Sequence, residues 1–494
     1  MPVSLTRDLD RLSRDHFDLL VVGGGIYGLT IAADAAQRGL RVALIEQGDF
    51  GGATSFQHLR TVHGGLRYLQ SLNLVRARQS IRERRTLARI APWAIEPLPF
   101  VLPLYGGLTR GPWAMRAAFL IDRILSADRN RALPASHHLP AGRVLSVAEA
   151  ASAYPRLRDT AIRGAAVWHD YLMQEADRLT LAWALAAAAD GAALANYVAA
   201  TRLCIAPAPA PRAVTGVEAV DVETGQTFTL RASAVVNATG AHVGRLLAPL
   251  GLDPRLPLMQ AVNLVTRRPA PAAAIGGRTA SGQHLFIVPW QGHAIVGTFE
   301  SSTCVQPGET RVSQADVERF LTAVQTAFPA WALTSDDITR VQCGVVPAVV
   351  DQTGQPSLDG RDLLFDHGEA VAGLHSVVGT KYTTARALAE RVVDRVVRAR
   401  GGETRPCRTA VTKLPHVALN GTALLRHAVA HEMVRRLSDL VLRRTTIGTA
   451  GDPGDAALQE VAAAVADAGW DAARVETGLT ECRAWFAGYG RGDA

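Results

Sequence analysis

The stretch FDLLVVGGGIYG occupies residues 17–28 and decides the fold. Its first half, through Val22, is a short apolar run of the kind that forms a buried parallel strand. Three glycines follow, and a helix is expected from about Ile26 to Arg38, ended by Gly39. A second apolar strand covers residues 41–45. Strand, tight turn, helix and strand in this order predict a βαβ unit at the start of the chain.

The glycine spacing within this unit is G-x-G-x-x-G, the pattern of a dinucleotide site. Gly23 allows the tight turn, Gly25 lets the backbone approach a pyrophosphate, and Gly28 lets helix and strand pack closely. The helix N-terminus then faces the negative charge. Glu46 ends the second strand, where an acid accepts the ribose hydroxyls. The dinucleotide contacts expected in this unit are Gly23, Gly25, Ile26, Tyr27, Gly28 and Glu46.

NAD and FAD both bind to this unit, so the glycine pattern alone does not choose between them. Its position at the start of a long chain, with sheet-like segments interleaved later, favours FAD. A distant apolar strand also ends in Asn237-Ala238-Thr239-Gly240. Two-dinucleotide-binding flavoproteins return to the cofactor at such a turn. Gly240 is therefore an expected FAD contact, as is Val198 in the strand expected near residues 195–203.

The most specific segment reads ATSFQHLRTVHGGLRYL, residues 53–69. It resembles the pattern A-T-S-S … K-L-[IV]-H-G-G-L-R-Y-L of FAD-dependent glycerol-3-phosphate dehydrogenases. The resemblance implies that Thr54 and Ser55 donate to the pyrophosphate, and that the glycine pair lets the backbone pass a flat ring. Arg67 and Tyr68 would project toward an anionic substrate, although an isolated Arg67 would be a surface ion-pair partner. Further FAD contacts implied here are Arg60, His63 and Gly65.

Other matches to the same family are spread from about residue 16 to residue 450. The triplets at 288–290 and 296–298 resemble its I-P-W and I-G-T, and Arg361 lies in a segment similar to T-R-D-Y. The run GTKYTT at 379–384 resembles G-G-K-L-T-T, which begins a helix whose positive end faces the flavin. Lys381 would add a charge that stabilises negative charge on the ring. Lys381 and Thr383 are expected cofactor contacts, and Leu442-Arg443-Arg444-Thr445 matches an element of the family's C-terminal domain.

Three positions depart from the family pattern. G-V-R-P reads Gly344-Val345-Val346-Pro347, so Val346 replaces an arginine that the family places at the substrate's anionic end. Asn263 stands near a position where many members carry histidine, and Arg60 replaces a lysine. The cofactor motifs are better preserved than the substrate motifs, which predicts a changed substrate.

The resemblance implies an FAD-dependent dehydrogenase that oxidises a small hydroxylated substrate, with or without a phosphate group. Hydride would pass to flavin N5 while a base takes the hydroxyl proton. Arg67, Tyr68 and Arg361 are the expected substrate contacts, and Lys381 the electrostatic residue. His63 is a candidate base, with a purely structural role in its glycine motif as the alternative. Other functions left open are oxidation of a different hydroxy or amino acid, a non-catalytic flavin-binding subunit, and an NAD-dependent dehydrogenase.

The expected fold class is α/β: a doubly wound FAD-binding domain of the glutathione-reductase type, an interleaved antiparallel substrate domain, and a helical C-terminal domain. A chain of 494 residues is long enough for several domains. The oxidoreductase region is expected over 16–400 and the helical domain over 401–494. Within the first, FAD-binding segments are expected at about 16–90, 177–250 and 355–400, and substrate segments at about 91–176 and 251–354.

Composition narrows the partners and the compartment. Five cysteines without a C-x-x-C pair argue against a disulfide framework or a zinc site and fit a reducing cytoplasm. The net charge of +7 is compatible with an anionic substrate, an anionic membrane or a solvated basic surface. No nucleic-acid-binding motif is present. Residues 1–16 do not resemble a secretory signal, and no run reaches the ~18 apolar residues of a membrane span.

A predicted helix over residues 113–126 has two interpretations. Trp113, Ala117, Leu120, Ile121 and Ile124 share one face, while Arg116 and Arg123 lie off it. Such a helix either packs its apolar face on the protein's own core or lies in a membrane interface with its arginines on anionic lipid. The family resemblance implies peripheral attachment to the inner face of the cytoplasmic membrane and a quinone or other electron acceptor.

Overall fold

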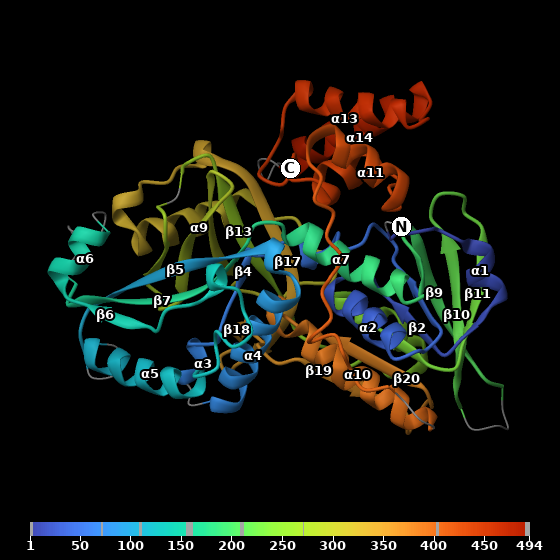
Figure 1. Ribbon diagram of the computed structural model, residues 1–494, viewed down its shortest axis with the longest axis horizontal. Coiled ribbons are helices and arrows are strands. Elements are labelled where there is room, and N and C mark those ends of the chain that lie inside the picture. Colours follow the sequence, from blue (N-terminus) through green and yellow to red (C-terminus); the bar gives the residue numbers. More distant parts are fainter. Residues whose placement is uncertain are drawn as a thin grey trace.

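The computed structural model describes residues 3–70, 73–107, 111–154, 162–207, 212–269, 271–401 and 405–489, without the side chains of Arg67, Gln70 and Tyr489. Three sheets and a helical C-terminal layer make up these ranges (Figure 1). The six-stranded sheet has the order β19-β20-β12-β2-β3-β8, the four-stranded sheet the order β1-β11-β10-β9, and a large sheet lies beside them. The predicted α/β class with an interleaved antiparallel part is confirmed.

The six-stranded sheet is the cofactor scaffold that the βαβ unit predicts. All neighbouring pairs are parallel except β19 with β20. One face is covered by α2 (Ile26–Gln37), α7 (Ala176–Ala189) and α10 (Ala385–Arg400). The strands are β2 (Leu19–Val22), β3 (Val42–Ile45), β8 (Ala193–Ala195), β12 (Val235–Asn237), β19 (Leu363–Asp366) and β20 (Leu374–Val378).

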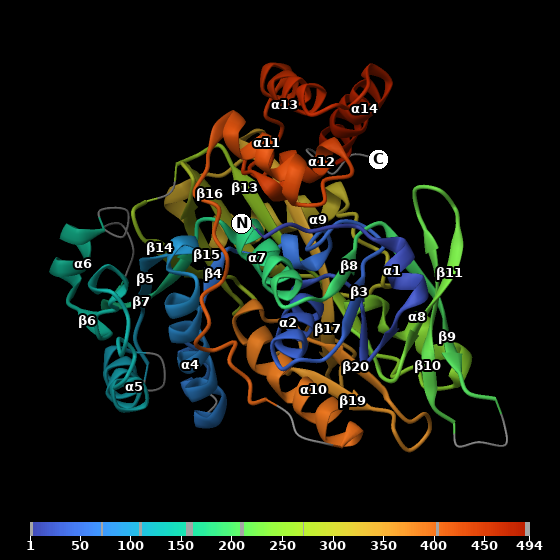
Figure 2. The ribbon, with the colours of Figure 1, turned by 45° about the vertical axis from the view of Figure 1, so that its right-hand side comes forward.

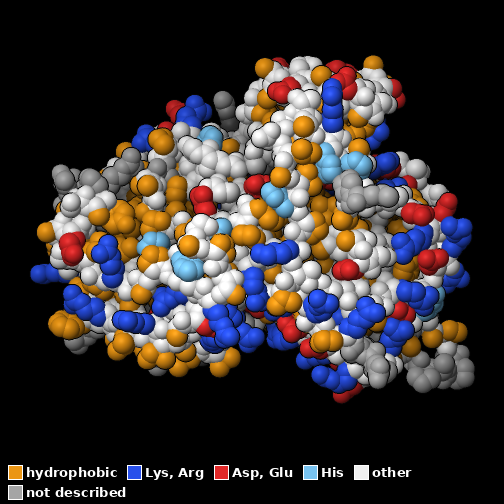
Figure 3. All heavy atoms as spheres, in the orientation of Figure 1, with side chains coloured by type: hydrophobic (Ala, Val, Ile, Leu, Met, Phe, Trp, Pro, Cys, Tyr) orange, Lys and Arg blue, Asp and Glu red, His pale blue; other side chains and the backbone are white. Residues whose placement is uncertain are grey.

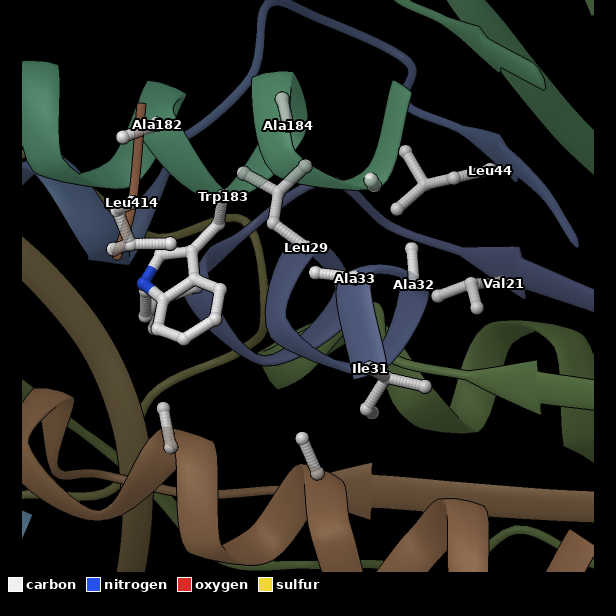
Figure 4. Packing of buried hydrophobic residues seen from close by; sticks show 14 of the residues in the cluster. Val21, Leu29, Ile31, Ala32, Ala33, Leu44, Ala182, Trp183, Ala184 and Leu414 are labelled. Atoms are coloured by element: carbon white, nitrogen blue, oxygen red, sulfur yellow. The ribbon is translucent and has the colours of Figure 1, made fainter. Parts of the chain in front are cut away.

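Apolar packing holds α2 between this sheet and its neighbouring helices. Leu29 and Ile31 of α2 are fully buried, and Trp183 of α7 packs beside them (Figure 4). Burying a side chain of the size of Leu29 stabilises the fold by roughly 1.5–3 kcal/mol. The helix is buried on nearly every face, which explains why its sequence lacks a polar stripe.

The opposite face of the scaffold carries the four-stranded sheet. Its apolar residues form one cluster with the alternate residues of β2, β3 and β12. This sheet stands at one edge of the molecule, away from the large sheet (Figure 2). Its strands are β1 (His16–Phe17), β9 (Val198–Ile205), β10 (Val214–Asp221) and β11 (Thr227–Ala232).

The large sheet is mostly antiparallel and runs in the order β18-β17-β13-β16-β15-β14-β5-β7-β4, with β6 beside β7. Helix α9 (Gln314–Ala327) packs on one face of it. Its strands are β4 (Thr61–Val62), β5 (Ile95–Leu104), β6 (Arg143–Leu145), β7 (Gly164–Met173), β13 (Leu258–Thr266), β14 (Ala274–Arg278), β15 (His284–Trp290), β16 (His293–Glu300), β17 (Ile338–Val350) and β18 (Pro356–Leu358).

The Pro-rich segment 97–103 is a strand, which its sequence does not suggest. It belongs to β5, which pairs with β7 along its whole length. Pro97, Pro99 and Pro103 are separated by even numbers of residues, so the N–H donors that they lack would all point to the same side of the strand. On the side away from β7 the only paired residues of β5 in the described ranges are Phe100 and Val101. Few ladder bonds are therefore lost.

The C-terminal helices form a layer above the six-stranded sheet (Figures 1 and 2). They comprise α11 (Gly421–His431), α12 (Leu437–Asp439), α13 (Asp455–Asp467) and α14 (Ala472–Tyr489). A π-helical turn, Leu440–Arg444, follows α12. Phe56, from far earlier in the chain, is buried within the apolar cluster of these helices. The layer is thus anchored to a loop of the cofactor scaffold.

Candidate functional site

The glycine turn lies where β2 ends and α2 begins. Gly23 has a φ of +107°, and a Cβ there would lie 2.6 Å from the carbonyl oxygen of Ala238. A Cβ on Gly28 would overlap the carbonyl oxygen of Gly23. Only glycine fits at these two positions, as the sequence predicts. Gly25 is the N-cap residue of α2 and has no side chain of its own to cap the helix, so the backbone at the helix N-terminus can face an anion.

Glu46 stands beside this turn at the end of β3. Its carboxylate accepts hydrogen bonds from the backbone N–H of Gly24 at 2.6 Å and of Gly48 at 2.8 Å. Burial raises the pKa of Glu46 above its ordinary value, although the two amide donors act in the opposite direction. Val198 is fully buried, and its N–H donates to the Glu46 carbonyl at 2.8 Å. Val198 therefore supports the acid through the backbone.

The predicted return of the chain to the turn also occurs. β12 pairs with β2, and the residues after it, Ala238 and Thr239, lie against Gly23. Gly240 follows with a φ of +59° and starts a short 3-10 helix. The glycine turn, Glu46 and the turn after β12 thus meet at the carboxyl edge of the sheet, where ligands of open α/β sheets bind.

The loop after Ala53 brings one of its two hydroxyls to α2. Ser55 Oγ accepts from the backbone N–H of Ile26 at 2.9 Å, at the helix N-terminus. Thr54 instead donates to the carbonyl of Val345 in β17 at 3.1 Å. Ser55 therefore lies where a pyrophosphate would meet the helix, whereas the Thr54 hydroxyl joins the loop to the large sheet.

The Arg60 side chain is directed into the interior of the protein. Its guanidinium is completely buried, pairs with Asp177 at 2.8 Å, and lies over the rings of Phe56 and Trp290. The lysine-to-arginine change noted in the sequence therefore falls on an internal ion pair. A buried arginine needs such a carboxylate partner, which the sequence pattern around residue 60 does not reveal.

His63 belongs to a polar cluster around the buried Asp170. Its Nδ1 lies 3.2 Å from Asp170 Oδ2, and its Nε2 lies 2.8 Å from the hydroxyl of Thr61. Burial alone would raise the pKa of Asp170, but the guanidinium of Arg84 and the His63 ring hold it below its ordinary value. An ionised Asp170 makes Nδ1 a donor, so Nε2 is the acceptor nitrogen. The His63 side chain remains 46% exposed.

A second cluster surrounds Tyr68. The Lys381 ammonium lies 4.0 Å from the centre of the Tyr68 ring, and the Arg76 guanidinium lies 5.9 Å from it. Tyr27 joins this cluster to α2: its hydroxyl donates to the Lys381 carbonyl at 2.9 Å and accepts from the Lys381 N–H at 3.1 Å. Burial raises the pKa of Tyr27, which keeps the hydroxyl protonated. Thr383 is buried at the following turn.

Of the two other predicted substrate arginines, Arg361 is not brought into this cluster. Arg361 is 65% exposed and bonds to Asp359 with its guanidinium, two residues away. Its neighbourhood contributes in another way, because Gly360 lies beside Lys381 and accepts from Arg76. Arg67 begins the short helix α3 (Arg67–Gln70), and its side chain lies outside the described residues.

Arg76 is the residue that the sequence does not single out. It lies in α4 (Leu74–Ile90), which also contains Arg78, Arg82, Arg84, Arg85 and Arg89. Arg76 reaches the 359–362 turn, with its guanidinium 3.7 Å from Asp362. Asp362 also pairs with Arg391 and accepts from Thr384. The sequence of α4 does not show which of its arginines reaches this turn. The packing of the helix decides that it is Arg76.

The departures from the family pattern lie on the large sheet. Val346 is buried and packs with Met259 and Leu358. It lies two residues from Gly344 in the same strand, so both face the same side of the sheet, and Gly344 faces Thr54. Val346 therefore points to the side of the cofactor loops. Asn263 is also buried, and its amide oxygen accepts from Thr298 at 2.9 Å, which makes its contact internal.

A separate apolar cavity of about 530 Å³ lies on the α9 side of the large sheet. Its walls include Pro99, Tyr154, Ile275, Phe328 and Trp331. None of the predicted site residues lines it. Within the described residues no cluster of three His, Cys, Asp or Glu side chains could hold a metal ion.

The described residues fit FAD. The glycine turn brings backbone without side chains to the sheet edge, α2 directs its N-terminus there, and Glu46 offers a carboxylate beside it. Residues 18–395 match the family model for the FAD dependent oxidoreductase. The chain belongs to this family of FAD-dependent oxidoreductases.

Its relatives within this class are glycerol-3-phosphate dehydrogenases. The Synechocystis enzyme is 30% identical over 459 residues, which cover 86% of this chain and 80% of that one. The Mycobacterium leprae enzyme is 32% identical over 395 residues, or 78% of this chain and 64% of that one. The Bacillus halodurans glycerol-3-phosphate dehydrogenase complexed with FAD has the same fold, with a TM-score of 0.72 at 23% identity, covering 97% of this chain and 96% of that one.

The close approach at Gly28 gives a direct test of the cofactor turn. Gly28→Ala should push α2 away from the end of β2, destabilise the protein by roughly 1–3 kcal/mol, and lower its FAD content. The measurement is flavin absorbance released on denaturation, per mole of folded protein. Gly308→Ala is the matched control, because a Cβ there meets nothing within 4 Å. Equal FAD content in the two variants would contradict the packing argument.

Proposed function

We propose that this protein oxidises a small secondary alcohol that is bound between the Tyr68 cluster and His63. The observation that carries the proposal is the meeting of Lys381, Tyr68 and Arg76 beside the turn that Tyr27 joins to α2. Such a cluster of two cations and a phenol suits the anionic or polar end of a small substrate. FAD, when bound, supplies the hydride acceptor.

Each protein group has a role in this proposal. Tyr68 and Arg76 bind and orient the substrate, and Arg67 remains a substrate contact that the sequence motif predicts. Lys381 supplies positive charge where negative charge develops during the reaction. His63 takes the hydroxyl proton at Nε2, because Asp170 fixes the other ring nitrogen as a donor. The substrate hydroxyl then replaces the Thr61 hydroxyl, which bonds to Nε2 in this structure.

The proton-transfer role of His63 is tested by His63→Asn. This substitution should lower the rate of flavin reduction by substrate roughly 10²–10⁴-fold, the usual contribution of a general base. The FAD affinity should stay within about twofold, since the ring does not hold the cofactor in this proposal. Stopped-flow reduction over a range of pH measures the effect, and the variant should lose the limb of the profile that reports the base. An unchanged profile would assign His63 a structural role.

Val346 determines the expected substrate. A phosphate dianion needs several charge-assisted donors, and the side chain here is a hydrocarbon. Losing one such bond costs roughly 1.5–3 kcal/mol, or one to two decades in affinity. We therefore expect glycerol 3-phosphate to be a poor substrate compared with a less charged or more apolar alcohol or amine. The relatives are named for glycerol 3-phosphate, but this chain has Val346 where the family pattern has arginine.

Val346→Arg should raise kcat/KM for glycerol 3-phosphate by about one to two decades. Val349→Arg, which adds the same charge to an exposed position of the same strand, should not. Wild-type kcat/KM of roughly 10⁴ M⁻¹s⁻¹ or more with glycerol 3-phosphate would show that another residue supplies the charge.

The substrate itself is found by anaerobic bleaching of the purified yellow protein. Glycerol phosphates, 2-hydroxy acids, polyols and amino acids are compared. Bleaching by a neutral or bulky alcohol would support the proposal. Bleaching by no small donor would support a flavin-binding subunit without turnover, and a colourless protein that binds NAD would refute the cofactor assignment.

Helix α5 (Pro112–Leu125) supports peripheral membrane contact. It packs through Met115 and Phe119, not through the apolar face predicted from its sequence. Trp113, Leu120 and Ile124 of that face are 80%, 63% and 71% exposed. Hydrophobic side chains gather along the lower edge of the molecule, where α5 lies, with basic side chains beside them (Figure 3).

This surface is proposed to rest on the inner face of the cytoplasmic membrane, where a quinone can take the electrons. No helix in the described ranges is both long and apolar enough to cross a bilayer. Trp and Leu on one face with Arg116 and Arg123 beside it are typical of helices that lie in the interface plane. The apolar surface and the arginines would act together.

Sedimentation with anionic liposomes tests this contact. The wild type should bind at low salt and bind less at about 1 M salt, where the screening length falls to about 3 Å. Replacing Trp113, Leu120 and Ile124 together with serine should abolish binding. The control replaces Val411 and Leu419, exposed apolar residues elsewhere, with serine. Equal binding of both variants would exclude α5 as the contact.

A further inference from the structure

We propose that Arg443 and Arg444 of the C-terminal layer are positioning residues for FAD. Acting through Asp49, they hold the turn of residues 46–52 in the shape that receives the adenosine end of the cofactor. This inference rests on the proposed placement of FAD along the glycine turn and at Glu46. It gives the helical layer, which contributes none of the expected cofactor or substrate contacts, a defined part in the site.

The 46–52 turn controls the geometry of the cofactor cradle. Gly51 donates its N–H to the carbonyl of Gly24 at 2.8 Å, and Gly24 donates its own N–H to Glu46. The buried Phe50 ring packs against Gly24 as well. A shift of this turn would therefore move both the carboxylate for the ribose and the backbone that faces the pyrophosphate.

Asp49 is the point at which the turn is held. Its side chain is completely buried and accepts from Arg443 Nε at 2.5 Å and from Arg444 at 2.7 and 2.9 Å. Asn196 donates a further bond at 2.9 Å. Burial opposes ionisation, but the guanidinium groups of Arg444 and Arg443 hold the pKa of Asp49 well below its ordinary value. The carboxylate is thus charged and depends on both arginines.

The arginines are themselves fixed in the helical layer. They end the π-helical turn Leu440–Arg444, a geometry often found at functional positions. Arg443 also donates to Asp439 at 2.7 Å, and Arg444 donates to the carbonyl of Glu432. Asp439 accepts from the hydroxyl of Tyr197 at 2.6 Å, and the Tyr197 N–H donates to Gly48 of the same turn at 2.9 Å. Two connected paths therefore join the layer to the turn.

The neighbouring loop is held by the same layer. Phe56 is inserted into the apolar cluster of the C-terminal helices, next to Ser55, whose hydroxyl lies at the N-terminus of α2. Arg340 lies over the Phe56 ring and donates to the carbonyl of Thr449 at 2.9 Å. The C-terminal layer thus contacts both loops that flank the glycine turn.

The experiment separates positioning of the cofactor from general stability. Asp49→Asn removes the charge that both arginines bind. Glu83→Gln is the matched control, because it weakens another buried bidentate pair, with Arg386, that does not touch the 46–52 turn. Apo and FAD-loaded forms of both variants and the wild type are compared. The quantities measured are the FAD Kd from flavin fluorescence, the Kd of ADP as a competitor, and the Tm of the apoprotein.

The expected result is that Asp49→Asn weakens both FAD and ADP binding at least tenfold, and that Glu83→Gln lowers the apoprotein Tm with both Kd values within twofold of wild type. If Asp49→Asn does not fold, Arg443→Lys carries the test, because it keeps the charge and loses the bridge between Asp49 and Asp439. Its FAD Kd should rise at least threefold. Unchanged Kd values, or equal changes in the control, would overturn the inference.

Measurements on the wild type distinguish a failure of this inference from a failure of the proposed function. A wild-type protein that binds FAD but is not bleached by any small donor would refute the catalytic proposal, and the positioning inference would still be decided by the Kd comparison. A wild-type protein without measurable affinity for FAD or ADP would refute the cofactor placement on which both rest.

Discussion

Helix α2 begins in contact with the end of β2, and the rest of the site depends on this approach. No side chain fits between Gly28 and the carbonyl of Gly23. Because the helix begins so close to the strand, its N-terminal N–H groups converge on the edge of the sheet, where an anion can bind. Glu46, Ser55 and the turn after β12 are placed around that point by neighbouring strands.

Buried charge is the second constraint. Asp49, Asp170 and Asp177 are carboxylates removed from water, and each is paired with arginine. A buried pair contributes little net stability but is costly to break, so it fixes the relative position of the elements that carry it. In this protein the two residues of a pair are separated by between 86 and 395 positions in the sequence. The pairs therefore set how the C-terminal layer, α4 and the large sheet meet the cofactor scaffold.

The sequence predicts the cofactor scaffold because its signals are local. The βαβ unit, the glycine turn and Glu46 lie within 30 residues, and each has a steric or electrostatic reason that one segment reveals. Arg60 and Arg361 were expected to contact cofactor and substrate, yet their guanidinium groups bond to Asp177 and Asp359. The side-chain partner of an arginine depends on tertiary packing, which a motif does not encode. For the same reason Arg76 and Asp49 gave no signal.

The substrate side follows a different logic from the cofactor side. FAD is a large ligand with fixed chemistry, so the residues that face it are constrained over several contiguous segments. In the proposed site a small substrate meets few side chains, which come from α3, α4, the turn before α10 and strand β17. One replacement on β17, at Val346, changes the charge on that wall without disturbing the sheet, since valine packs with Met259 and Leu358. On the proposed function, a change at this one strand position alters the substrate without altering the glycine turn or the contacts that the C-terminal layer makes with it.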